Sequence, residues 1–128
     1  MKPKRTIVCV GDNDTLRSSM KVTLETRGYR VVACPHEMAV ENLRRGADLI
    51  VVTDIGNPFA DAEQVIAEMK SACRGRPLVL VCAKPGMYDA QADASFVKGC
   101  YAMADLLERI RLLLLRKRGP KQHRTECA

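Results

Sequence analysis

Aromatic side chains are scarce in this sequence, and tryptophan is absent. Three tyrosines and two phenylalanines make up 4% of the 128 residues, so the core must consist mainly of aliphatic side chains and methionine. The chain is nevertheless long enough to bury a core of its own, and its length fits a single domain.

Long apolar runs are also missing. The longest, Leu49 to Val52 and Leu112 to Leu115, fall far short of the ~20 residues that span a bilayer. The apolar stretch near the N-terminus follows Met-Lys-Pro-Lys-Arg and stops at Gly11, which is too short for a signal peptide. We therefore expect a cytoplasmic protein.

Cysteine pairs with C-x-x-C spacing, which would indicate a zinc or redox site, are not found among the six cysteines. Cys9 and Cys82 lie inside apolar runs that resemble strands. We expect reduced cysteines that pack mostly as small hydrophobic side chains, in keeping with a reducing compartment.

Positive charge is concentrated at the C-terminus. The formal net charge is +6, and four of these charges come from residues 116–128, where five basic residues accompany one glutamate. The rest of the chain lacks the charge excess of a nucleic-acid-binding surface. We predict one folded domain over residues 1–118 and a flexible basic tail over 119–128, with no nucleic acid or membrane as partner.

Apolar runs alternate with segments of helical period along the whole chain. The predicted strands are Thr6 to Val10, Arg30 to Cys34, Leu49 to Thr53, Leu78 to Cys82 and Ser95 to Val97. Between and after them, apolar residues recur at helical spacing from Leu16 to Leu24, Met38 to Leu43, Ala62 to Cys73 and Met103 to Leu114. Asp61 and Gln64 resemble a capping box ahead of the third of these helices.

Five such alternations predict an α/β fold, a doubly wound, five-stranded parallel sheet with helices on both faces. A sheet of this kind commonly has the flavodoxin-like strand order 2-1-3-4-5. Only a short segment separates the fourth and fifth strands, so the helix between them is expected to be shortened, over about Met87 to Ala92, or irregular.

Polar residues that could carry chemistry follow the predicted strands, where ligands bind in such sheets. Asp12, Asn13 and Asp14 follow the first strand, Asp54 the third and Lys98 the fifth, while Cys82 ends the fourth. If the first and third strands are neighbours, Asp12 and Asp54 share one cleft with Lys98 at its edge. Carboxylates with backbone oxygen suit Mg2+, and a lysine can neutralise a phosphoryl group.

Other kinds of site find no support. Gly11-Asp12-Asn13 lacks the spacing and the Lys-Ser/Thr pair of a phosphate-binding Walker loop. His36 and His123 lie in a predicted loop and in the tail, so both are expected to be exposed to solvent.

The arrangement resembles the receiver domains of two-component response regulators, the CheY-like superfamily, from Arg5 to about Arg118. The most specific stretch is Asp48 to Pro58, which is similar to the family's third strand with its phosphoacceptor aspartate four residues before a proline. Val10-Gly11-Asp12-Asn13, Pro77 to Ala83 and Phe96-Val97-Lys98 are similar to the family's acidic turn, fourth strand and lysine-bearing fifth strand.

The resemblance implies a single-domain receiver in phosphorelay signalling rather than an enzyme. Asp54 would accept a phosphoryl group from a histidine kinase or phosphotransfer protein, and Lys98 would pair with that group. Mg2+ would be held by the carboxylates of Asp12 and Asp54 and the backbone carbonyl of Gly56. Residue by residue, Asp12 could instead cap the first helix, and Lys98 could be an ordinary surface lysine.

Several positions depart from the family pattern. Gly11 replaces the first acid of the turn, Cys82 replaces the Thr or Ser that would hydrogen-bond the phosphoryl group, and Ser95 occupies the place of the switch aromatic. Gly99 follows the lysine in place of the expected proline. The spacing from Asp48 to Asp54 is one residue longer than usual, which leaves Thr53 as a competing register for the acceptor position.

Two functions from different classes remain. The chain is either a phosphorylatable receiver, or a pseudo-receiver that binds proteins and has lost phosphorylation-dependent switching. Other flavodoxin-like proteins are less consistent with the sequence, because no hydroxyl-rich loop for flavin follows the first strand. Leu112 and Leu115 could also form a homodimer or partner surface on the last helix, unless that helix only covers the sheet.

Overall fold

The computed structural model describes residues 4–55, 62–82 and 92–115. Within these ranges the strands are β1 (Thr6–Val10), β2 (Arg30–Cys34), β3 (Leu49–Ile55), β4 (Leu78–Cys82) and β5 (Ala94–Val97). The helices are α1 (Asp14–Glu25), α2 (Ala39–Arg44), α3 (Ala62–Ala72) and α4 (Met103–Leu115), and a short 3-10 turn, η1 (His36–Met38), precedes α2. The predicted alternation of strands and helices is confirmed.

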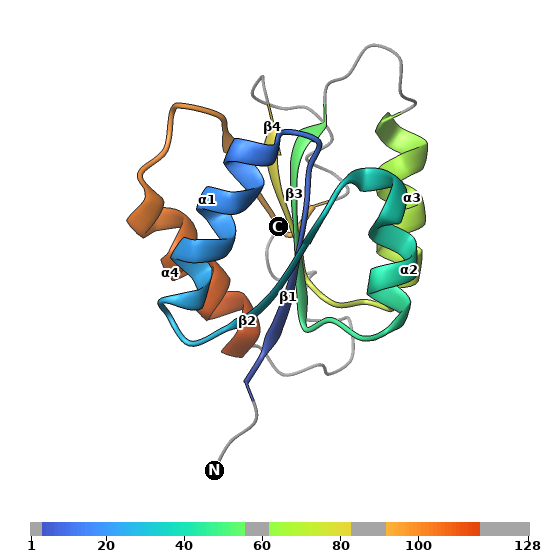
Figure 1. The fold of residues 1–128 in the computed structure, drawn as a ribbon, viewed down its shortest axis with the longest axis horizontal. Coiled ribbons are helices and arrows are strands. Elements are labelled where there is room, and N and C mark those ends of the chain that lie inside the picture. The colour runs from blue at the N-terminus through green and yellow to red at the C-terminus, as the bar shows by residue number, and fades with distance from the viewer. Residues whose placement is uncertain (1–3, 56–61, 83–91, 116–128) are drawn as a thin grey trace, which may run out of the picture.

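All five strands are parallel and follow the order β2-β1-β3-β4-β5, as predicted. β1 lies between β2 and β3, with Val10 level with Cys34 on one side and Val52 on the other. The helices lie on both sides of the sheet, α1 and α4 on one face and α2 and α3 on the other (Figure 1). This is the doubly wound architecture in which a ligand site forms beyond the carboxyl ends of the strands.

The alternation of side chains along each strand divides the core into two layers. Val8, Ile50 and Leu80 point toward α2 and α3, where they pack with buried residues such as Ile66 and Met69. The opposite layer contains Ile7, Cys9, Leu49, Val51, Val79 and Val81 together with Met20 and Leu24 of α1 and five buried residues of α4. Because both faces are covered, the central strands are apolar over most of their length.

Element boundaries differ from the prediction in two informative places. β3 extends to Ile55 rather than ending at Thr53, because a bulge lets the strand continue pairing with β4 past Asp54. The second helix begins as a 3-10 turn at His36, immediately after Pro35, and becomes α-helical only from Ala39. The Asp61 side of the predicted capping box, the predicted helix near Met87 and the basic tail lie outside the described residues.

Five cysteines fall within the described residues, and none of them forms a disulfide there. Cys9, Cys34, Cys73 and Cys82 are buried, whereas Cys100 is exposed. Burial raises the pKa of Cys9 to about 12, helped by the nearby Cys34, although Arg17 acts in the opposite direction. Burial likewise raises the pKa of Cys34 and Cys73. No helix in the described part of the chain is long and apolar enough to cross a membrane.

These differences predict selective modification by a thiol reagent. At pH 8 in the folded state, Cys100 should react with iodoacetamide, while the other four described cysteines stay unmodified because thiolate is the nucleophile and these thiols are buried. Peptide mass mapping after a short pulse would measure this. In denaturant all five should react at similar rates, and fast labelling of Cys9 in buffer would contradict the packing described above.

Candidate functional site

The carboxyl ends of the strands meet at one edge of the sheet. β1 leads into the turn Gly11-Asp12-Asn13, β3 ends just beyond Asp54, and β4 and β5 end at Cys82 and Val97, followed by Lys98. Because β1 and β3 are neighbours and β4 and β5 continue the sheet, the backbone of these predicted site residues is brought to the same edge. The side chain of Asp54 and all of Gly56 lie outside what the structure describes.

A β-bulge lies at the predicted phosphoacceptor. Thr53 pairs with Val81, and Ile55 pairs with the next residue of β4, Cys82, so that Asp54 is the extra residue between them. A bulge of this kind interrupts the alternation of side chains and redirects the inserted residue, which is why bulges are frequent near functional sites. The bulge adds one residue to β3 between Asp48 and the end of the strand.

Thr53, the alternative position for the acceptor, has a structural role. Its side chain is 1% exposed, and its hydroxyl donates a hydrogen bond of 3.1 Å to the carbonyl oxygen of Val10. A Cβ atom added at Gly11 would lie 2.1 Å from the Thr53 Oγ1 atom, so a side chain at position 11 and this hydroxyl exclude each other. The missing first acid of the turn is therefore explained by Thr53, which fills the space that an acidic side chain would need.

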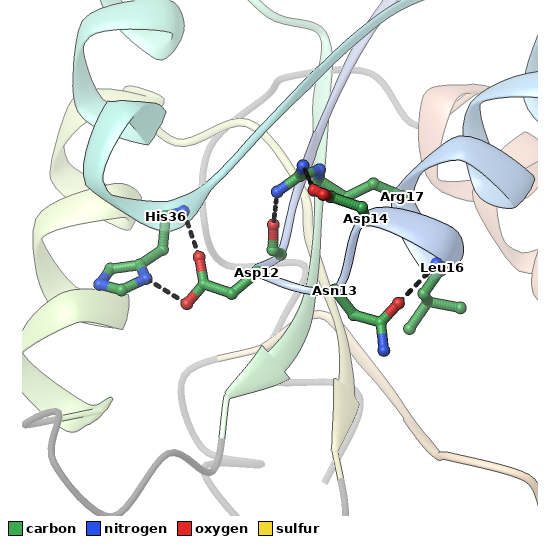
Figure 2. Close-up of polar contacts among 7 residues, drawn as sticks. Asp12, Asn13, Asp14, Leu16, Arg17 and His36 are labelled. Atoms are coloured by element: carbon green, nitrogen blue, oxygen red, sulfur yellow. Dashed lines mark hydrogen bonds and ion pairs between the residues drawn. The ribbon is translucent and has the colours of Figure 1, made fainter.

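Asp12 is turned toward the β2 side of the site. Its two carboxylate oxygens accept from the backbone N–H of His36 at 3.2 Å and contact Nδ1 of the same residue at 2.7 Å (Figure 2). His36 lies at the surface, as expected, with 34% of its side chain exposed, but it is also paired with an aspartate. Sequence reasoning missed this because 24 positions separate the two residues, and only the pairing of β1 with β2 brings their loops together.

The possibility that Asp12 caps the first helix is also excluded. The capping residue of α1 is Asn13, whose side-chain oxygen accepts from the N–H of Leu16 at 2.9 Å (Figure 2). With the helix capped by Asn13, the Asp12 carboxylate is left for partners outside α1.

Arg17 is a second residue that the sequence did not single out. Its guanidinium donates to the carbonyl oxygen of Gly11 at 2.5 Å and also pairs with Asp14, and its side chain is only 17% exposed (Figure 2). A positive charge therefore lies against the turn that was expected to concentrate negative charge. Together with the loss of the first acid at Gly11, this arrangement lowers the attraction of the turn for a cation.

Cys82 and Lys98 lie at the ends of adjacent strands. The backbone N–H of Lys98 donates to the carbonyl oxygen of Cys82 at 2.7 Å, directly beyond the last paired residues of β4 and β5. The Cys82 side chain is buried at 2% exposure in the layer under α2 and α3, whereas Lys98 is exposed. A thiol is a weaker hydrogen-bond donor than a hydroxyl.

Phe96, the aromatic residue beside Ser95, is partly buried. Ser95 is exposed, and Phe96 points into the α1 and α4 layer, where its ring packs against Tyr101 with centroids 5.3 Å apart. On α4, Leu112 and Leu115 are 46% and 64% exposed. The homodimer or partner surface expected there stays a prediction.

The described residues contain no group of three or more acidic, histidine or cysteine side chains arranged to hold a metal ion. Of the predicted magnesium ligands, only the Asp12 side chain belongs to the described part of the chain. The Asp54 side chain and Gly56 lie outside it. His123, like the rest of residues 116–128, also lies beyond the described part of the chain. The assignment of the individual site residues therefore stays a prediction.

Comparison with known proteins identifies the fold. Neither the family models nor the curated proteins include a match to the sequence. Among solved structures, the chemotaxis protein CheY4 of Vibrio cholerae is similar at a TM-score of 0.74 and 16% identity, over 87% of this chain and 99% of that one. A CheY-like receiver domain protein of Methanospirillum hungatei gives a TM-score of 0.75 and 22% identity, over 88% and 94%.

The response regulator TrrA of Thermotoga maritima, solved with Mg2+ and a beryllium fluoride, gives a TM-score of 0.72 and 23% identity, over 85% of this chain and 98% of that one. A chain of the complex between the histidine kinase ThkA and TrrA gives 0.72 and 25%, over 86% and 98%. These similarities confirm at the level of the fold the resemblance inferred from the sequence.

The contact between Gly11 and Thr53 leads to a testable prediction. Gly11→Ala should lower the free energy of unfolding by about 1–3 kcal/mol, since the added methyl overlaps the Thr53 hydroxyl. Thr53→Ala alone should cost about 1 kcal/mol or more through the lost hydrogen bond to Val10. The double variant should lose less free energy of unfolding than the sum of the two single losses, as measured by urea unfolding. Strictly additive losses would show that the two sites do not compete for space.

Proposed function

Because the chain has the fold of CheY-like response-regulator receiver domains, we propose that it accepts a phosphoryl group on Asp54 in a phosphorelay. The donor would be the phosphohistidine of a histidine kinase or phosphotransfer protein. The supporting observation is the position of Asp54 on the bulge at the carboxyl end of β3, between the acidic turn after β1 and the Cys82 and Lys98 ends of β4 and β5.

In the proposed transfer, a carboxylate oxygen of Asp54 attacks the phosphorus atom as the bond between phosphorus and the donor imidazole nitrogen breaks. The bulge presents Asp54 outside the regular ladder of β3, and the buried strands around it hold the backbone in place. Lys98, the first residue after β5, would supply positive charge to the transferred group. Transfer then depends on positioning and electrostatic stabilisation.

The available donors fit a magnesium ion, although they favour a weak site. Asp12 provides carboxylate oxygens, the ligand type that Mg2+ prefers, and its side chain is 42% exposed. Asp12 and Asp54, with the carbonyl of Gly56, would hold the ion, whose charge would offset that of the phosphoryl group. His36 would have to release Asp12 first, and Arg17 opposes the ion by its own charge.

Two neighbours of known structure support the proposal by analogy. TrrA has been solved with Mg2+ and a beryllium fluoride, and it has also been solved in complex with the histidine kinase ThkA. For the present chain we likewise infer a kinase or phosphotransfer protein as the partner that delivers the phosphoryl group, and a further protein as the partner that reads the outcome.

A pseudo-receiver is the second candidate, and specific contacts favour it. The Asp12 carboxylate is paired with His36, a guanidinium lies against Gly11, and Cys82 is buried where the family has a hydroxyl. Each of these features weakens either metal binding or the response to phosphate. In this function the chain would bind its partner whether or not Asp54 is intact.

Phosphorylation of Asp54 separates the two functions. Incubation with acetyl phosphate and Mg2+ should add one phosphoryl group per chain, and Asp54→Asn should abolish the addition, as measured by intact-protein mass spectrometry. Thr53→Ala serves as the matched control for the competing register and should still be modified. If the wild-type mass stays unchanged, and beryllofluoride with Mg2+ leaves the amide spectrum unchanged as well, the pseudo-receiver function replaces the proposed one.

The pairing of Asp12 with His36 predicts a gain in metal affinity when the histidine is removed. His36→Ala should tighten Mg2+ binding by about twofold to fivefold, because an exposed polar contact worth up to ~1 kcal/mol no longer has to be broken. Asp12→Asn should weaken binding instead. Titration of the amide resonances with Mg2+ would measure both changes, and equal affinity in His36→Ala and wild type would mean that the pair does not compete with the metal.

A further inference from the structure

A cleft lies at the opposite end of the sheet from Asp12 and Asp54. It has a volume of about 520 Å3 and is formed where the chain leaves α2 and α3 and enters β3 and β4. Four arginines line it: Arg44 is the last residue of α2, Arg45 follows it directly, and Arg74 and Arg76 come after α3. Among the described residues of the lining, Asp48 is the only acidic one, so the walls carry a clear excess of positive charge.

The arginines of the cleft differ in how they are held. Arg76 is partly buried, with 30% of its side chain exposed, and it lies 3.6 Å from the Asp48 carboxylate, which also accepts from the backbone N–H of Thr6 at 2.8 Å. Arg45 pairs with Glu41 on the outer surface of α2. Arg44 and Arg74 form no ion pair within the described residues, so their guanidinium groups are available to a ligand.

Arg74 is held in an unfavourable backbone conformation. Its φ angle is +55°, and among the described residues it is the only one other than glycine with a positive φ. Glycine would fit this position without the steric cost that an L side chain incurs, and the chain has glycine at the next position, Gly75, with a φ of +82°. Strain of this kind is commonly retained where the side chain has a function.

Neutralisation of helix dipoles accounts for only part of this charge. Basic residues near the carboxyl end of a helix are favourable, and Arg44 and Lys70 in the last turns of α2 and α3 satisfy that role. Arg76 lies beyond the end of α3 and is directed to Asp48. Lys70 already supplies a basic residue in the last turn of α3. Arg74 lies beyond that turn, and its backbone conformation costs stability.

We propose that this cleft binds a compact polyanion that carries phosphoryl groups. Guanidinium groups present paired donors that match phosphate oxygens, and the volume lies within the range of small-molecule sites. The described lining includes no aromatic side chain on which a base could stack. The positive charge is gathered in a concave site rather than spread along an extended surface, which favours a small ligand over a nucleic acid.

Inorganic pyrophosphate is the probe for this site. Titration of the full chain in EDTA, without Mg2+, should give saturable binding, with amide shifts concentrated at residues 43–48 and 72–76. Arg74→Gly should weaken binding about tenfold through the loss of a charge-assisted contact, while the melting temperature stays equal or rises because the left-handed backbone is relieved. Arg74→Lys, which keeps the positive charge but loses the paired N–H donors of the guanidinium, should bind more weakly than the wild type.

Two controls separate this site from the phosphoacceptor end. Asp54→Asn should bind pyrophosphate like the wild type, so a failure of phosphorylation leaves the present proposal intact. Arg109→Ala, which removes an exposed arginine from α4, should also leave the affinity unchanged. The proposal is overturned if Arg74→Gly binds as tightly as the wild type, if the shifts lie around Asp12, or if duplex DNA binds this cleft more tightly than pyrophosphate.

Discussion

The pairing of β1 with β3 in the middle of the sheet determines where everything else can lie. The two strands run in register from Ile7 beside Leu49 to Val10 beside Val52, and all of these residues are buried. Each such side chain contributes about 1.5–3 kcal/mol through burial, so a shift of register would expose an entire layer of the core. With this pairing fixed, the turn after β1 and the end of β3 must lie side by side.

The same pairing brings Thr53 against Gly11, and this contact alters the chemistry of the acidic turn. A hydroxyl that satisfies a backbone carbonyl of β1 takes the space of a carboxylate. The guanidinium of Arg17 donates to the carbonyl oxygen of Gly11, and the imidazole of His36 pairs with the Asp12 carboxylate. The turn is therefore stabilised by contacts within the protein: Gly11, Asp12 and Thr53 each have a partner from a distant part of the chain or from α1.

The two ends of the sheet differ in charge for a structural reason. Loops at the carboxyl ends of the strands lead into the amino end of α1 and the turn η1, where acidic side chains such as Asp14 are favourable. Loops at the opposite end follow the carboxyl ends of α2 and α3, where arginines gather. Since each end draws its residues from different loops, a ligand at one end need not compete with a ligand at the other.

Hydrophobic periodicity was sufficient to predict the strands, the helices and the parallel, doubly wound sheet, because burial on two faces leaves a strong local pattern of apolar residues. The motif spacing also located Asp12, Asp54, Cys82 and Lys98 near one edge of the sheet.

The partners of these residues could not be predicted. His36 and Thr53 reach Asp12 and Gly11 only across strand pairs, and the bulge at Asp54 arises from the register between β3 and β4. Local sequence thus determined which elements form and where polar residues end them, whereas contacts between distant segments, set by strand register, decided how those residues are paired.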